Sequence, residues 1–272
     1  PPPPRPPPPP PPRLLSSASS DVYKRQGRVQ DQQLLEEEIQ KRTADLQSSN
    51  DELRQFAYTA SHDLREPLGK IKAFGARLDE KYSDVLDERG AEYLSVMLSA
   101  TVRMTSLIDD LLEYSRLGKE RTCEPVAVSS VLRDVVGMLS EKLDGATVHF
   151  SEALPILRAD KQQVNMLFQN LLSNSLKFRH PNHPCEIFIT HTSTSRHHIF
   201  KVMDNGIGFD QDYAGKIFQV FERLHTRFDF PGTGIGLALC KKIMDQHGGY
   251  IHGEGVPDQG ATFWIGFPKE QS

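Results

Sequence analysis

The sequence predicts an α plus α/β protein: a helical hairpin that forms a dimeric four-helix bundle, followed by an α/β sandwich domain. Apolar residues recur at helical spacing in two stretches between residues 53 and 112, joined by a short polar connection. From about residue 123, short strand-like runs alternate with helical runs and glycine clusters. The 272 residues, of which 38% are hydrophobic, suffice for two modest cores.

The composition excludes several kinds of protein. Lys and Arg number 32 against 36 Asp and Glu, a net charge of −4 that argues against nucleic acid or an anionic membrane as partner. Three widely spaced cysteines without a CxxC pair argue against a disulfide framework or a zinc site, and favour a cytoplasmic location. The apolar runs are far shorter than the roughly 20 residues that cross a bilayer, so we expect no membrane segment in this chain.

The first 52 residues divide into two segments. Residues 1–26 open with a proline-rich run that reads either as a polyproline linker or as an assembly artefact, and we expect this tail to be disordered. Residues 27–52 repeat Ile39 and Leu46 seven apart, a period that continues to Leu53 and favours a parallel two-stranded coiled coil over a single solvated helix.

Residues 53–118 form the predicted hairpin, with a turn at 81–89 and a helix stop at Gly118. Its first helix contains His62, which lies about 200° from the apolar position Ala60 and is expected to face solvent. A neutral imidazole on an exposed face is a competent nucleophile, and Asp63 beside it can orient it or take its proton. An isolated exposed histidine is nevertheless most often a bystander. Pro67 is expected to kink or loosen the helix.

Residues 124–270 form the predicted α/β domain. Ser129 is expected to cap a helix reaching residue 138, and Asp160 to cap a second one reaching residue 178. A third helical run covers residues 237–244. Strands are predicted at 147–150, 186–190, 199–203, 250–252 and 261–267.

Three segments of this domain carry polar or glycine-rich patterns. Asn170, Asn174 and Lys177 share one helix face, which suits Mg²⁺ and phosphate but also fits an ordinary solvated face. Asp204 follows a strand and can accept a hydrogen bond from an exocyclic amine, although a DxGxG run is also a common turn. The glycine-rich run at 232–236 precedes a helix, where backbone N–H groups can cradle phosphate.

Taken in order, these segments resemble the sensor histidine kinases of two-component systems. FAYTASHDLREPL (56–68) resembles the H box, QNLLSNSLKF (169–178) the N box, and IFQVFERLH (217–225) the F box. DNGIGF (204–209) and GTGIGLAL (232–239) resemble the glycine boxes. The sequence SHDLREPL (61–68) is similar to that of the phytochrome-like or PAS-linked subgroup.

This resemblance implies roles for particular residues. His62 would be the phospho-acceptor and Asp63 its general base, while Asn174 would coordinate Mg²⁺. The segment 210–231, with Phe218 and Phe221, would form a mobile lid. Residues implied to contact ATP are Asn170, Asn174, Lys177, Asp204, Gly206, Gly208, Gly232, Thr233, Gly234, Gly236, Leu237 and Thr262.

The implied activity is ATP-dependent autophosphorylation of His62 in a homodimer, with transfer to the receiver domain of a response regulator under control of an upstream sensor module missing here. Glu66 occupies a position where many family members carry Thr or Asn, which argues against phosphatase activity. Two rival interpretations are a pseudokinase scaffold and a GHKL-type ATPase (the gyrase, chaperone and mismatch-repair fold) without histidine phosphorylation.

Overall fold

The computed structural model describes residues 1, 3–5, 17–117, 122–143, 145–224, 230 and 232–269. It does not describe the side chains of residues 17–37, 46, 47, 50, 51, 53, 54, 56, 57 and 142. The chain divides into two compact units, Pro1–Gln55 and Phe56–Ser272.

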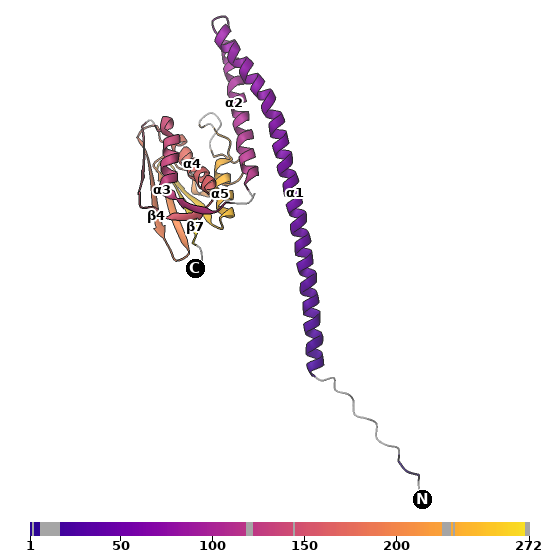
Figure 1. Cartoon of the computed structure of the whole chain (residues 1–272). Coiled ribbons are helices and arrows are strands. Elements are labelled where there is room, and N and C mark those ends of the chain that lie inside the picture. Colours follow the sequence, from indigo (N-terminus) through magenta and orange to yellow (C-terminus); the bar gives the residue numbers. More distant parts are fainter. Residues whose placement is uncertain are drawn as a thin grey trace. The chain divides into compact units, whose positions relative to one another are not determined.

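A long helix, α1 (Ser17–Tyr82), accounts for the described part of the first unit beyond residue 5 and continues into the second (Figure 1). The prediction of disorder over residues 1–26 is therefore wrong from residue 17 onward, because a polar sequence with few helix breakers continues the helix towards the N-terminus. Residues 6–16 lie outside the described part of the chain. Ile39 is 55% exposed in the single chain, so the coiled-coil pairing stays a prediction.

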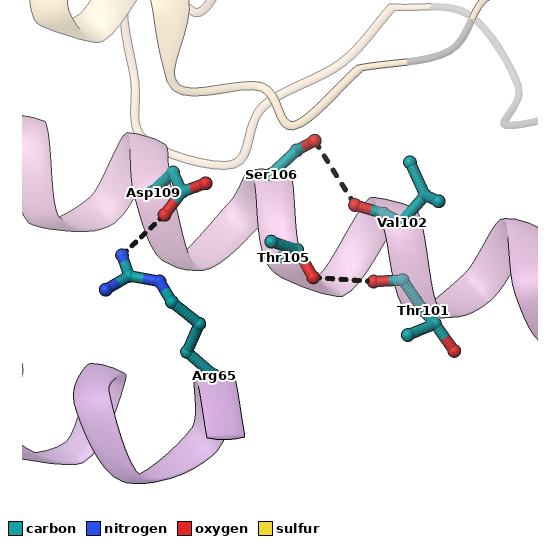
Figure 2. Close-up of polar contacts among 6 residues, drawn as sticks. All are labelled: Arg65, Thr101, Val102, Thr105, Ser106 and Asp109. Carbon is teal, nitrogen blue, oxygen red and sulfur yellow. Dashed lines mark hydrogen bonds and ion pairs between the residues drawn. The ribbon is translucent and has the colours of Figure 1, made fainter. Parts of the chain in front are cut away.

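The hairpin is completed by α2 (Glu88–Arg116), which runs back after a short connection. Asp87 caps it by accepting a hydrogen bond from the Gly90 amide at 2.8 Å. The predicted turn at 81–89 is thus confirmed, whereas the helix stop at Gly118 lies outside the described residues. An ion pair between Arg65 of α1 and Asp109 of α2, 2.6 Å from Nη2 to Oδ1, joins the two helices (Figure 2).

The hairpin leaves much apolar surface uncovered within one chain. Its own small core consists of Leu68, Ile108 and Leu112. The apolar residues at helical spacing on α1 are therefore only partly buried in a single chain, since Leu64 is 49% and Ile71 43% exposed. Other large apolar side chains exposed on the hairpin are Phe74, Leu78, Tyr93, Val96, Met97, Val102 and Met104.

The described residues of the α/β domain form two sheets. The larger has the strand order β2-β4-β5-β7-β6, in which only β2 and β4 pair in parallel. Its strands are β2 (Ala146–Phe150), β4 (Cys185–Ser193), β5 (His197–Asp204), β6 (Tyr250–Val256) and β7 (Gly260–Pro268). All five predicted strands are confirmed, each somewhat longer than its apolar run. The smaller sheet, β1 (Glu124–Ala127) with β3 (Ile156–Ala159), was not predicted.

Three helices pack against the larger sheet in one core (Figure 1). They are α3 (Val128–Met138), α4 (Lys161–Lys177) and α5 (Gly236–Gln246), at the positions that the apolar periodicity predicted. Asp160 caps α4 as expected, accepting from the Gln163 amide at 3.1 Å. The predicted cap at Ser129 is wrong: the N-cap of α3 is Ala127, two residues earlier, and it makes no side-chain capping bond.

Candidate nucleotide and phospho-acceptor sites

His62 lies on α1 with an exposed side chain, as its helical position predicted. Its side chain is 70% accessible, and Nδ1 lies 3.3 Å from Oδ1 of Asp63. Ser61 and Leu68 occupy the buried side of the same helix, and Pro67 lies within it. The ring is therefore presented outward, with one nitrogen against a carboxylate and the other free of any described partner.

A cavity of about 470 Å³ lies in the α/β domain, large enough for a nucleotide-sized ligand. Of the twelve residues implied to contact ATP, ten line it: Asn170, Asn174, Lys177, Asp204, Gly208, Gly232, Thr233, Gly234, Gly236 and Leu237. The structure therefore brings together residues that are up to 67 positions apart, from Asn170 to Leu237. The same cavity is also lined by Ser106 and Asp110 of α2.

One face of α4 supplies the amide and ammonium groups of the cavity. The opposite face buries Val164, Phe168 and Leu171 in the core, which fixes the rotation of the helix. The Asn170 side-chain amide group donates to the Met166 carbonyl at 2.9 Å, so its own side-chain oxygen keeps its capacity to accept from or coordinate a ligand. Asn174 lies one turn further along the same face.

Lys177 ends α4 in a half-buried position. Burial lowers the pKa of its ammonium to about 8, and the nearby Arg223 guanidinium contributes to the shift in the same direction. Its Nζ lies 4.1 Å from the centre of the Phe178 ring. Two cations side by side in a partly desolvated cavity make this region suited to a polyanion.

Asp204 is buried at the end of β5 within a dense hydrogen-bond network. Its Oδ1 accepts from the amides of Gly206 and Ala261 at 3.0 and 3.2 Å, and Oδ2 accepts from the Ser175 hydroxyl at 2.9 Å. Burial raises the pKa of this carboxyl, and the three hydrogen bonds oppose that shift. Oδ2 keeps acceptor capacity for a ligand amine because a carboxylate oxygen has two lone pairs.

The glycines after Asp204 are explained by backbone packing. A Cβ on Gly206 would collide with the Phe178 carbonyl, and one on Gly208, where φ is +63°, with the Val256 carbonyl. Gly206 itself does not appear among the described residues around the cavity. These close approaches explain why both positions are glycine, and the contact with ATP that the resemblance implies for them stays a prediction.

The glycine-rich loop before α5 faces the polar side of α4. A Cβ on Gly236 would lie 2.6 Å from Oδ1 of Asn170, and one on Gly232 would lie 2.7 Å from Nζ of Lys177. α5 has no side-chain cap, so its first backbone N–H groups are available to an anion. Arg223 supports the loop by donating to the Gly232 carbonyl at 2.8 Å.

Several residues differ from the sequence-based expectation. Thr262 does not line the cavity in the described structure, whereas Ala261 and Phe263 do, because alternate residues of a strand face opposite sides. Phe218 and Phe221 of the predicted lid do not line it either, although Phe218 packs against the core. Of the predicted lid, residues 210–231, the structure describes residues 210–224 and 230.

Sequence reasoning missed other residues of the cavity. Arg223, within the F-box run, donates to the Gly232 carbonyl, and the Ser175 hydroxyl donates to Asp204. Neither residue is among those that the sequence implied. The contribution of α2 had no sequence signal, since Asp110 and Thr233 are 123 positions apart. No group of three or more His, Cys, Asp or Glu side chains suited to a metal ion occurs among the described residues.

Comparisons with known proteins agree with this geometry. Residues 52–120 match the family model of the His Kinase A (phospho-acceptor) domain. Residues 159–271 match that of the histidine kinase-, DNA gyrase B- and HSP90-like ATPase. His62 thus falls in the first domain, and the α4 face, Asp204 and the glycine-rich loop fall in the second.

Individual relatives cover most of this chain. It is 38% identical over 235 residues to cyanobacterial phytochrome A of a Nostoc species, a match that covers 85% of this chain and 30% of that protein. It is 30% identical over 270 residues to the circadian input-output histidine kinase CikA of Synechococcus elongatus, covering 92% of this chain and 36% of that protein. The crystal structure of full-length ShkA in complex with AMPPNP matches with a TM-score of 0.61 at 25% identity, over 80% of this chain and 47% of that one.

A helical hairpin with an outward-facing histidine, joined to an ATPase-type α/β sandwich, defines a two-domain phospho-acceptor and ATP-binding core. The chain belongs to the sensor histidine kinases, of which it comprises these two domains. It spans 30–36% of the length of the first four curated relatives that it matches. Within the described residues, none of the helices combines the length and apolar character needed to span a bilayer.

Proposed function

We propose that the protein binds Mg-ATP in the α/β domain and transfers the γ-phosphoryl group to His62. One observation carries this proposal: a single chain holds an exposed imidazole oriented by a carboxylate and a separate cavity lined by amides, cations and a glycine-rich loop. Neither feature alone distinguishes a kinase from an ATPase, but their combination supplies both the nucleophile and the phosphoryl donor site.

The cavity residues fit the parts of the nucleotide. Asp204 would accept the adenine amine at Oδ2, where acceptor capacity remains beside the Ser175 bond. The phosphates would lie against the glycine-rich loop and the uncapped start of α5, near Lys177 and Arg223. Asn174 offers an amide oxygen to Mg²⁺, a hard oxygen ligand of the kind this ion prefers, and the ion would offset phosphate charge.

The contact between His62 and Asp63 selects the attacking nitrogen. With Nδ1 protonated and donating to Asp63, the lone pair of Nε2 points away from the carboxylate. Nε2 would attack the γ-phosphorus, forming an N–P bond while the P–O bond to the leaving ADP breaks. The ring gains positive charge in this step, and Asp63 would stabilise it or accept the Nδ1 proton.

The proposed kinase acts as a homodimer with protein partners. The exposed apolar side chains of both hairpin helices need a second hairpin to bury them, and a four-helix bundle does so. The phosphoryl group would pass from His62 to an aspartate of a response-regulator receiver domain, with an upstream sensor module controlling the hairpin. Glu66 pairs with Lys70 at 2.5 Å instead of presenting a neutral side chain to water, so we propose weak phosphatase activity.

Labelling with γ-labelled ATP tests the proposal. The full chain should acquire an acid-labile, base-stable label that His62→Gln abolishes and Asn174→Ala strongly reduces. His62→Gln should keep the wild-type Kd for Mg-ADP because His62 does not line the cavity in the described structure. ATP hydrolysis without a phosphorylated histidine would favour the ATPase alternative, and absence of nucleotide binding would favour the scaffold.

A further inference from the structure

The hairpin helix α2 contacts the nucleotide cavity through a carboxylate. Oγ1 of Thr233, in the middle of the glycine-rich loop, donates to Oδ2 of Asp110 at 2.5 Å. One turn further along α2, the Tyr114 carbonyl accepts from Nζ of Lys242 in α5 at 2.7 Å, and this Nζ lies 4.1 Å from the centre of the Tyr114 ring. Asp110 and Tyr114 are four residues apart, so both contacts lie on the same face of α2.

Asp110 occupies the kind of position that favours an anion. Thr233 lies between Gly232 and Gly234, three residues before the 11-residue helix α5 begins without a side-chain cap. The Thr233 hydroxyl also accepts from the Ile235 amide at 3.4 Å, which ties its orientation to the start of that helix. The Asp110 carboxylate accepts from a hydroxyl that lies beside the helix end where a phosphate would bind.

The surroundings of Asp110 show that it is placed there by the fold and is not a solvated surface group. Burial raises the pKa of this carboxyl, the Thr233 bond opposes the shift, and the neighbouring Asp109 charge adds to it. Asp109, by contrast, is about half exposed and pairs with Arg65 on the other side of the hairpin (Figure 2). Two adjacent acids of α2 therefore have different partners: Asp109 joins the hairpin helices, and Asp110 faces the cavity.

We propose that Asp110 is an intramolecular competitor of the nucleotide phosphates, so that ATP binding displaces it and releases α2 from the glycine-rich loop. The proposal rests on the proposed nucleotide site and adds a consequence to it. Since both anions require the same loop, each excludes the other, and nucleotide affinity and hairpin docking are thermodynamically coupled. Binding of ATP then frees the hairpin that carries His62, and docking of α2 holds the nucleotide-free protein in a resting arrangement.

The first test compares nucleotide affinity of matched variants in the full-length chain. Asp110→Asn keeps the size of the side chain and removes its charge, and should lower the Kd for Mg-ADP about five- to tenfold. Asp109→Asn changes the neighbouring acid in the same way and should leave the Kd within about twofold of wild type. Isothermal titration calorimetry with Mg-ADP measures both, and thermal unfolding confirms that both variants are folded.

The second test follows α2 directly by hydrogen exchange. In the wild type, Mg-ADP should increase exchange in the peptide covering residues 104–116, whereas in Asp110→Asn the exchange should be high already and change little. An unchanged Kd in Asp110→Asn would overturn the proposal. A higher Kd would also overturn it, because Asp110 would then contribute favourably to nucleotide binding. Wild type that fails to bind Mg-ADP at all would instead overturn the proposed function, so the two failures are distinguishable.

Discussion

Replacing Asp204 by asparagine should change the proposed adenine end of the cavity with little effect on the surrounding backbone. The side-chain oxygen of the asparagine can keep both backbone bonds that Oδ1 of Asp204 now accepts, from Gly206 and Ala261. The Ser175 hydroxyl, which donates at 2.9 Å, can rotate and accept from the new amide. The acceptor available to a ligand amine is thereby exchanged for a donor.

The expected loss of affinity follows from two terms. A hydrogen bond to a charged group contributes about 1.5–3 kcal/mol, and a buried donor left facing another donor costs about 1–3 kcal/mol more. Together they predict a roughly 100-fold or greater increase in the Kd for Mg-ADP, since about 1.4 kcal/mol corresponds to tenfold. The relative preference for guanine nucleotides should increase, because the guanine carbonyl can accept from the new amide.

Stability should respond in the opposite sense. Burial raises the pKa of Asp204 above its unfolded value, so keeping it ionised costs folding free energy. This loss of folding free energy is absent at acidic pH, where Asp204 is protonated in both states. It grows as the pH rises above the pKa of Asp204 in the unfolded chain, and is constant above the pKa in the folded protein. The amide side chain of the Asp204→Asn variant does not ionise, so its Tm at pH 7 should not be lower than that of the wild type.

Calorimetric titration with Mg-ADP and thermal unfolding at pH 7 check both parts. Asp245→Asn is the matched control, because Asp245 pairs with Lys241 on the exposed surface of α5 and is not among the residues of the cavity. Wild-type affinity in Asp204→Asn would refute the assignment of Asp204 to the adenine amine. A large fall in Tm would instead show that the carboxylate is mainly structural.

Three further predictions concern the phosphate end, the backbone and the bundle. The pKa of Lys177 is lowered to about 8, so its positive charge is present below that pH and lost above it. The affinity for Mg-ADP, measured by calorimetric titration, should therefore fall between about pH 7 and 9 in the wild type. It should not fall in Lys177→Arg. Gly208→Ala places a Cβ against the Val256 carbonyl at a φ of +63°, and should lower the free energy of unfolding in urea by about 2–4 kcal/mol. In Gly137→Ala, the control in α3, the new Cβ meets no atom within 4 Å, so the free energy of unfolding should be unchanged or higher. Phe74→Glu, at a side chain 62% exposed in the single chain, should convert the proposed dimer to a monomer in light scattering, while Lys72→Glu should not.

Local signals in the sequence predicted the elements well. The helix from Asp160 was predicted because its cap, its apolar face and its polar face all lie within one short segment. The five strands of the larger sheet were found by their apolar runs. By contrast, β1 and β3 are four residues each, and β1 contains Pro125, so their pairing depends on tertiary contacts that no local pattern shows.

The site was predicted less completely, for two physical reasons. Thr262 was assigned to the nucleotide site by resemblance to a family position. Successive residues of a strand face opposite sides, however, and the cavity is lined by its neighbours on β7. Arg223 and Asp110 reach the cavity from a loop and from another domain, through contacts that arise only when the chain is folded. The clustering of Asn174, Lys177 and the glycine-rich loop was predicted, because each was part of a recognisable motif.

Separation of the proposed nucleophile, His62, from the proposed nucleotide site has a consequence for the proposed reaction. His62 is fully presented on α1, yet it is not among the described residues around the cavity, so the nucleotide γ-phosphate in this arrangement would not meet it. Transfer therefore needs either a change in the position of the α/β domain or a histidine from a second chain. In the first case, the contacts of Asp110 with the loop and of Tyr114 with α5 must open as the domain moves away from its own α2. ATP that replaces Asp110 at the loop would lower the free energy needed to open these contacts. Release of the domain from α2 would then depend on the presence of the phosphoryl donor.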